Sequence, residues 1–156
     1  MTSKMSGITK KLHYTIGLVA VFGIVDASIL TYQHYANSRL PCSVTRGCEV
    51  VLNSKYSVIA GVPLAALGVA FYLSVLTATI ISLKSNKAWL KDLLLLMGFS
   101  GFLTSLGLVY IQGFIIRAWC QYCLFSALSS TLIFALSLAL AMSGQSDNKQ
   151  LNKESE

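Results

Sequence analysis

The residues of this chain with the clearest chemical potential are its four cysteines, which form two short-spaced pairs. One pair is Cys42 and Cys48, and the other is Cys120 and Cys123 in the stretch AWCQYCLFSAL. Cysteine pairs of this kind form disulfides, bind zinc or exchange electrons with other thiols. The second pair stands directly before an apolar run, so its chemistry would take place at the mouth of a membrane helix.

Membrane helices are the elements that must position these cysteines. The chain has 156 residues, of which 54% are hydrophobic and 12% are charged, and its mean hydropathy is +0.65. A bilayer span needs about 20 apolar residues. Three windows of that length or more contain no Lys, Arg, Asp or Glu, and a fourth, at the N-terminal end, is interrupted only by Asp26; they cover 56–83, 93–116, 118–146 and 12–38. We therefore expect an all-α, polytopic membrane protein with a bundle of four transmembrane helices.

The first apolar window has a second interpretation, a signal peptide, because three lysines precede it. A signal peptide has a short apolar core and then a cleavage site of small residues. Here the stretch continues through SILTYQHYA, whose aromatic residues suit a membrane interface. We therefore predict a helix over about 12–35, then a long outer loop to about Ala60. The second helix should start at GVPLAALG, with Pro63 in its first turn.

The C-terminal part completes the bundle. After the third helix we expect a tight turn near Arg117 and then a fourth helix that Cys120 opens. From Gly144 the chain is polar and close to neutral, which predicts disorder. The expected organisation is one membrane domain over 1–143 and a disordered cytoplasmic tail over 144–156.

The basic residues predict the orientation. With a cytoplasmic N-terminus, eight lysines would lie inside and four basic residues outside. Cytoplasmic segments carry the excess of Lys and Arg, so we expect both termini in the cytoplasm. Two helices separate the cysteine pairs, which places both pairs on the same side of the membrane. With the termini in the cytoplasm, that side is the outer face of the cell (inner) membrane, where disulfides persist. The net charge of +6 is then a signal of topology and of attraction to anionic lipid, with no case for nucleic acid.

Four interpretations of the cysteines compete. A four-cysteine zinc site is disfavoured because structural zinc sites use two short-spaced pairs in a soluble knuckle. Here five residues separate Cys42 from Cys48, and the other pair lies at the start of a helix, so we predict no metal ligand. Haem attachment requires a histidine after Cys-x-x-Cys, and Leu124 stands there. Inert structural disulfides would make this a non-enzymatic membrane protein. A redox relay is favoured, because a two-residue spacer at a helix start suits a reducible bond and Arg117 would lower the thiol pKa further.

The order of these features resembles the vitamin K epoxide reductase family in its bacterial form, without a fused thioredoxin-like domain. The resemblance covers about 16–141 and rests on four elements: the Cys42/Cys48 spacing, Ser54 six residues after Cys48, the GVP start of the second helix, and WCQYC. The DsbB-type quinone reductases carry their CxxC in the first outer loop, which is the reverse order.

The resemblance implies a quinone-dependent thiol–disulfide oxidoreductase that supports disulfide bond formation. A reduced, periplasmic thioredoxin-like (DsbA-like) partner would pass electrons to a Cys42–Cys48 disulfide, with Cys42 meeting the partner. Cys48 would then attack a Cys120–Cys123 disulfide at Cys120. Cys123 would face the electron acceptor, a membrane quinone that could be ubiquinone or menaquinone.

Three further positions bear on the mechanism. In the family, the serine matching Ser54 lies close to the quinone, which makes Ser54 a candidate binding residue. Animal members place a tyrosine where this chain has Ala127, so epoxide reduction is not expected. Asp26 lies inside a span and is a functional candidate for that reason. It either takes up protons during quinone reduction or, as the simpler expectation, lies near a water-accessible edge beside a hydroxyl of the third or fourth helix.

Overall fold

The computed structural model describes residues 7–36, 47–59, 61–85 and 87–153, with the backbone alone for Ala88 and 144–153. Within these residues four helices are long and apolar enough to span a membrane. They confirm the predicted fold class of an all-α, four-helix membrane bundle. The four are α1 (Gly7–Ala36), α3 (Leu64–Ser85), α4 (Ala88–Tyr110) continued by the π-helix η1 (Ile111–Ile116), and α5 (Gln121–Lys153).

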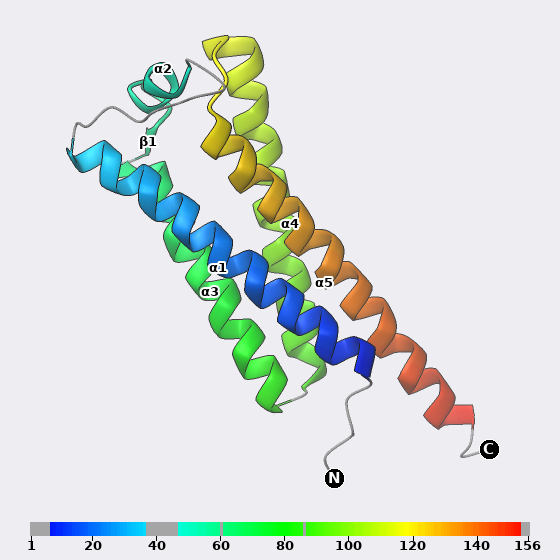
Figure 1. The fold of residues 1–156 in the computed structure, drawn as a ribbon. Helices are drawn as coiled ribbons and strands as arrows, with labels where there is room; N and C mark the ends of the chain where they lie inside the picture. Colours follow the sequence, from blue (N-terminus) through cyan, green and yellow to red (C-terminus); the bar gives the residue numbers. More distant parts are fainter. Residues whose placement is uncertain (1–6, 37–46, 60, 86, 154–156) are drawn as a thin grey trace.

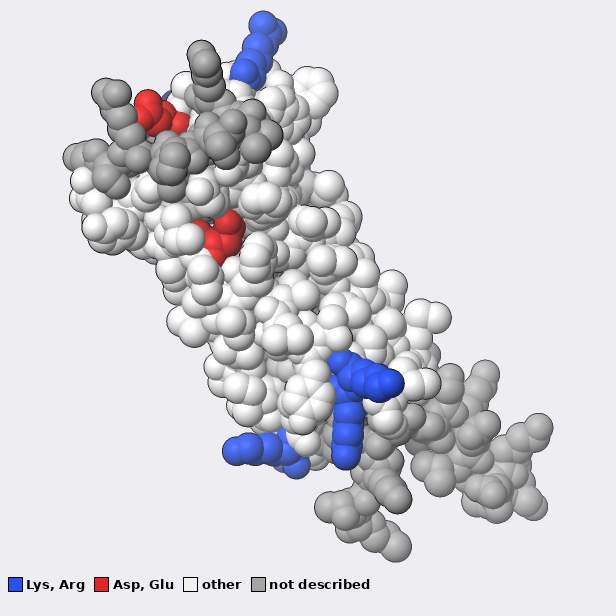
Figure 2. Space-filling view, viewed as in Figure 1, with Lys and Arg blue, Asp and Glu red and all other residues white. Residues whose placement is uncertain are grey.

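The four helices pack as two pairs, α1 with α3 and α4 with α5, and α1 also packs along α5 (Figure 1). The described chain begins and ends at one end of the bundle, and α2 lies at the other end (Figure 1). On the face that Figure 2 shows, Lys and Arg lie toward the ends of the molecule and most of the length between them is uncharged. The uncharged length fits a bundle that crosses a bilayer, and the common end of the first and last helices fits an even number of crossings (Figure 1).

Small residues let the helices approach closely at the core. The ring of Tyr72 covers Gly23, where an added Cβ would meet the ring at 2.5 Å, and the backbone at Phe134 lies 2.9 Å from the position of a Cβ on Gly98. Around these contacts lies a buried apolar cluster drawn from all four helices: Ile16, Ala20, Ala27, Tyr72, Val75, Ala78, Leu94, Ile133 and Leu140.

The connection between α1 and α3 contains short elements that the sequence did not predict. They are α2 (Cys48–Leu52) and a two-stranded antiparallel hairpin of β1 (Val58–Ile59) and β2 (Val62–Pro63), in which Val58 pairs with Pro63. Gly61 turns the hairpin with φ of 82°, a value that glycine adopts without steric cost. Pro63 therefore ends β2 and does not lie in the first turn of the helix, because the N–H of Leu64 still donates to Ser57 O (2.8 Å) and closes the hairpin.

The fourth spanning helix differs from expectation at both ends. It begins at Gln121, one residue after Cys120. Its backbone stays helical through 144–153, where the sequence predicted a disordered tail. This stretch contains no proline to stop a helix, and its Gln and Lys residues have good helix propensity.

Candidate functional site

Cys120 caps the N-terminus of α5. Its carbonyl accepts the first helical hydrogen bond, from Leu124 N–H (3.1 Å), and its Sγ accepts a hydrogen bond from Cys123 N–H (3.3 Å). The first N–H groups of a helix have no partner within the helix, and here a sulfur takes the place of the usual oxygen cap. The Cys123 thiol also donates to Cys120 Sγ, at 2.8 Å. Both cysteines are free thiols in this structure.

These hydrogen bonds lower the pKa of Cys120. The largest cause is the hydrogen bond from the Cys123 thiol, followed among the lowering causes by the backbone N–H groups of Cys123 and Tyr122. Burial and the charge of Asp26 oppose the shift. The pKa of Cys120 is thus lowered by hydrogen bonds from the first turn of α5. From the sequence, such a lowering is expected in part from the charge of Arg117. Cys120 is the thiol of this pair that more readily becomes a thiolate.

The turn before Cys120 is held by Gln112, a residue that the sequence analysis missed. Gln112 is 3% exposed, and its side-chain oxygen accepts a hydrogen bond from Cys120 N–H at 3.1 Å. Its carbonyl accepts another from Ala118 N–H at 3.2 Å. Gln112 lies in the π-helix η1, an element that often occurs at functional sites. Arg117 follows with φ of 56°, a left-handed conformation that costs a non-glycine residue about 1–2 kcal/mol.

Cys48 lies beside Cys120 in one buried cluster at this end of the bundle. The cluster contains Leu30, Cys48, Val51 and Cys120, and the two cysteines are 1% and 0% exposed. Cys48 is disulfide-bonded. Cys42, the remaining cysteine of the chain, lies outside the described residues. The structure therefore brings three of the four predicted site cysteines together and leaves the fourth undescribed.

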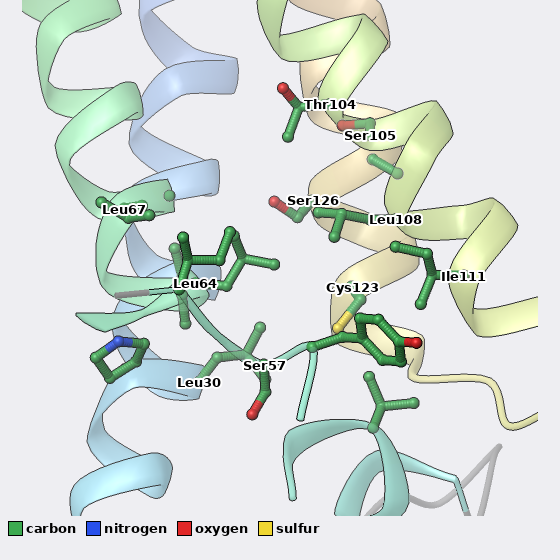
Figure 3. A pocket seen from close by; sticks show the side chains of 18 of the residues that line it. Leu30, Ser57, Leu64, Leu67, Thr104, Ser105, Leu108, Ile111, Cys123 and Ser126 are labelled. Carbon is green, nitrogen blue, oxygen red and sulfur yellow. The ribbon is translucent and has the colours of Figure 1, made fainter. Parts of the chain in front are cut away.

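Cys123 packs against this cluster and also lines a cavity between the two helix pairs. The cavity has a volume of about 400 Å³. Figure 3 shows the Cys123 sulfur directed into it, with Leu30, Ser57 and Leu64 on one side and Leu108 and Ile111 on the other. Most of its lining is aliphatic or aromatic, and nine of the lining residues carry a hydroxyl group. Small-molecule sites combine apolar walls with polar groups in this way, so the cavity suits a largely apolar ligand with hydrogen-bonding groups.

Ser54 and Ala127 both line this cavity. Ser54 follows α2, and its hydroxyl donates to Val51 O at 2.7 Å, so it closes a turn as well as facing the cavity. Its lone pairs remain able to accept a hydrogen bond. At position 127, where the animal members of the resembled family place a tyrosine, this chain presents only the methyl group of an alanine to the cavity.

Two polar residues of the cavity were not predicted. Tyr72, 2% exposed, donates from its hydroxyl to Ser126 O (2.8 Å) and lies 2.9 Å from Ser126 Oγ. The two residues come from α3 and α5 and both line the cavity. The sequence carried little signal for them, since a tyrosine and a serine in apolar runs are as common in helix packing. Gln112, in contrast, is a lone amide in LVYIQGFII and stands out within a predicted span.

The comparison with known families agrees with this geometry. The sequence model of the vitamin K epoxide reductase family matches residues 14–138, which is most of the chain. No curated protein matches the sequence. The four apolar helices and the cluster that holds Cys48 and Cys120 are consistent with this family. The chain belongs to the vitamin K epoxide reductase family, and it is a membrane thiol–disulfide oxidoreductase.

Proposed function

We propose that this protein reoxidises a thioredoxin-like (DsbA-like) partner and passes the electrons to a membrane quinone, either ubiquinone or menaquinone. The electrons travel from the Cys42/Cys48 pair to the Cys120/Cys123 pair. The protein lies in the cell (inner) membrane with both termini in the cytoplasm and the cysteines on the outer face. In this way it supports disulfide bond formation outside the cytoplasm.

The observation that carries the proposal is that the two hydrogen-bonded CxxC cysteines have different neighbours, since Cys123 lines the cavity and Cys120 does not. Cys120 lies in the buried cluster with Cys48, on the side of the loop that contains the first pair. Cys123 lies one helical turn further on and lines the apolar cavity. A two-residue spacer therefore connects a protein-facing thiol with a ligand-facing thiol.

The relay consists of thiol–disulfide exchange steps followed by quinone reduction. Two partner thiols reduce the Cys42–Cys48 disulfide, with Cys42 forming the mixed disulfide. Cys48 then attacks the Cys120–Cys123 disulfide at Cys120, and Cys123 leaves as a thiolate. Return attack by Cys42 on Cys48 frees Cys120, so the second pair becomes a dithiol and the first pair a disulfide again.

The cavity supports a quinone as the acceptor. Its volume of about 400 Å³ falls within the range of small-ligand sites. The lining offers apolar contacts for a ring, and the hydroxyls of Ser54, Ser57 and Ser126 are within the lining for its carbonyl oxygens. When bound, a quinone supplies a two-electron, two-proton acceptor. Ser54 is therefore proposed as a binding residue, in line with the family resemblance.

The alternative is a non-enzymatic membrane protein with structural disulfides or a four-cysteine metal site. Within the described residues, no three His, Cys, Asp or Glu side chains lie close enough together to hold a metal ion. A metal site that includes Cys42 would involve a residue outside that set. Metal analysis of the purified protein addresses this alternative directly.

The two functions are separated by thiol alkylation in membranes with and without quinone. A relay that has lost its acceptor accumulates free thiols on all four cysteines, because the partner keeps delivering electrons. A non-enzymatic membrane protein with structural disulfides shows the same alkylation pattern in both membranes. Equal labelling in the two membranes would overturn the proposed function.

A further inference from the structure

Asp26 is the one acidic residue of α1. The residue is 5% exposed, and its Oδ2 has no hydrogen-bond partner among the residues the structure describes. It lies one turn beyond Gly23, which the ring of Tyr72 covers, and next to Ala27, which lines the cavity. The carboxyl is thus buried, and among the described residues its Oδ2 lacks the hydroxyl partner that the simpler expectation gave it.

Within the part of the chain that the structure describes, three titratable groups interact electrostatically with Asp26, and each is neutral or anionic. They are the phenol of Tyr72 from α3 and the thiols of Cys120 and Cys123 at the start of α5, each close enough to interact electrostatically with the carboxylate. A buried carboxylate without a positive partner is costly, and such a group holds a proton readily. A negative charge on Cys120 favours the protonated form of Asp26 further, because a Cys120 thiolate and an Asp26 carboxylate would repel each other.

The local geometry joins this carboxyl to the reacting thiols. Leu30, one turn from Asp26 on α1, lies in the buried cluster with Cys120, while Cys123 donates to Cys120 and lines the cavity. We infer that Asp26 stores the proton that Cys120 releases on becoming a thiolate, and returns it when the quinone is reduced. This inference rests on the proposed function and adds a residue to it.

The proton balance requires a store of this kind. Oxidation of the Cys120–Cys123 dithiol forms one S–S bond and releases two electrons and two protons, and reduction of a quinone to the hydroquinone takes up the same number. One proton comes from the Cys123 thiol. The other leaves Cys120 before the electrons move, because the thiolate is the reactive form. Asp26 keeps that proton beside the site, so one negative charge is shared between Asp26 and Cys120 throughout.

Two hydroxyl groups offer a route from the carboxyl to the cavity. The ring of Tyr72 covers Gly23, one turn before Asp26, and its hydroxyl is hydrogen-bonded to Ser126; both Tyr72 and Ser126 line the cavity. Either hydroxyl of that pair can be the donor. A proton can therefore reach the ligand without the carboxyl touching it, and Asp26 is a proton-storing residue that acts through this pair.

The first test needs no quinone. In a Cys42→Ser, Cys48→Ser background only the second pair remains, and thiolate absorbance measures the ionisation of Cys120. Because the charge of Asp26 raises the pKa of Cys120, Asp26→Asn should move this titration to lower pH, and Asp26→Glu should keep it near that of the parent. Ser137→Ala is the matched control, since Ser137 is 0% exposed and its Oγ also lacks a described partner. An Asp26→Asn titration that coincides with the Ser137→Ala titration would overturn the inference.

The second test follows quinone reduction in the protein with all four cysteines. Asp26→Asn should reduce the rate of quinone reduction on the order of 100-fold, which is the lower end of the contribution that a general acid makes to a rate. The remaining rate should fall more steeply as pH rises. Asp26→Glu should restore most of the rate, and its infrared carboxyl band should shift on dithiol oxidation, as that of the parent does. If the parent protein reduces no quinone, the proposed function fails. If the parent is active and Asp26→Asn has the same rate and pH profile, only the role of Asp26 fails.

Discussion

Gly47 lies in backbone contact with Trp119: a Cβ on Gly47 would be 2.7 Å from both the N and the O of Trp119. These two residues immediately precede Cys48 and Cys120, so their contact sets the spacing between the two cysteine pairs. Only a residue without a side chain fits between α2 and the turn that leads into α5. The contact explains how a loop residue is held beside the start of a membrane helix.

We expect Gly47→Ala to slow exchange between the pairs. Inserting a methyl group into a tight contact costs about 1–3 kcal/mol, and at about 1.4 kcal/mol per factor of ten a displaced Cys48 should exchange about 10-fold more slowly. Gly107→Ala is the control, because a Cβ at Gly107 meets nothing within 4 Å. The measurement is the rate at which a reduced thioredoxin-like protein reduces the second pair. Equal rates in the two variants would show that this contact does not position Cys48.

The relay order predicts a trapped intermediate. The double variant Cys42→Ala, Cys123→Ala has neither of the thiols that can open a Cys48–Cys120 disulfide, so Cys48 and Cys120 should remain joined once that bond has formed. Cys42→Ala alone should still permit exchange between Cys48 and Cys120 but should block oxidation of the partner protein. Non-reducing peptide mapping measures both, and finding Cys48 as a free thiol in the oxidised double variant contradicts the order.

The ionisation of Cys120 should depend on the donor at position 123. Because a hydrogen bond favours the charged acceptor, the folded protein lowers the pKa of Cys120, and its thiolate forms at a lower pH than that of an ordinary cysteine at about 8.5. Cys123→Ala removes the largest cause and should move the titration upward, whereas Cys123→Ser retains a donor and should move it less. The pH dependence of alkylation of Cys120 measures this. Identical profiles in the alanine and serine variants would rule out the thiol donor as the cause.

The parts of this account that depend on composition could be predicted from the sequence, and the parts that depend on short-range geometry could not. The four spans follow from windows free of charge, and the common side of both cysteine pairs follows from an even number of spans between them. In contrast, α2 and the hairpin are too short to show a periodicity. Gln112 and Gly47 act through contacts with the turn at Cys120. Such contacts between distant residues cannot be predicted from a local sequence pattern. Pro63 shows the same limit, because its position one residue before a helix depends on the bond between Leu64 and Ser57.

The topology prediction concerns the side of the membrane on which the chemistry takes place. A reporter fused after Lys153 should be active in the cytoplasm, and one inserted near Arg46 should be active outside. The reason is the excess of lysine at the end of the bundle that contains the termini. An external signal from the C-terminal fusion would place the cysteine pairs in the reducing compartment, where a disulfide-forming relay would not work.

The central claim is tested most directly by reconstitution of the purified protein in vesicles that contain a quinone. A reduced thioredoxin-like protein is added, and quinone absorbance and partner thiols are followed together. The relay predicts that one quinone is reduced for every two partner thiols oxidised, and that this coupling is lost in Cys123→Ala, while Ser137→Ala behaves as the parent protein does. Oxidation of partner thiols without loss of quinone, or quinone reduction that persists in Cys123→Ala, would contradict the account.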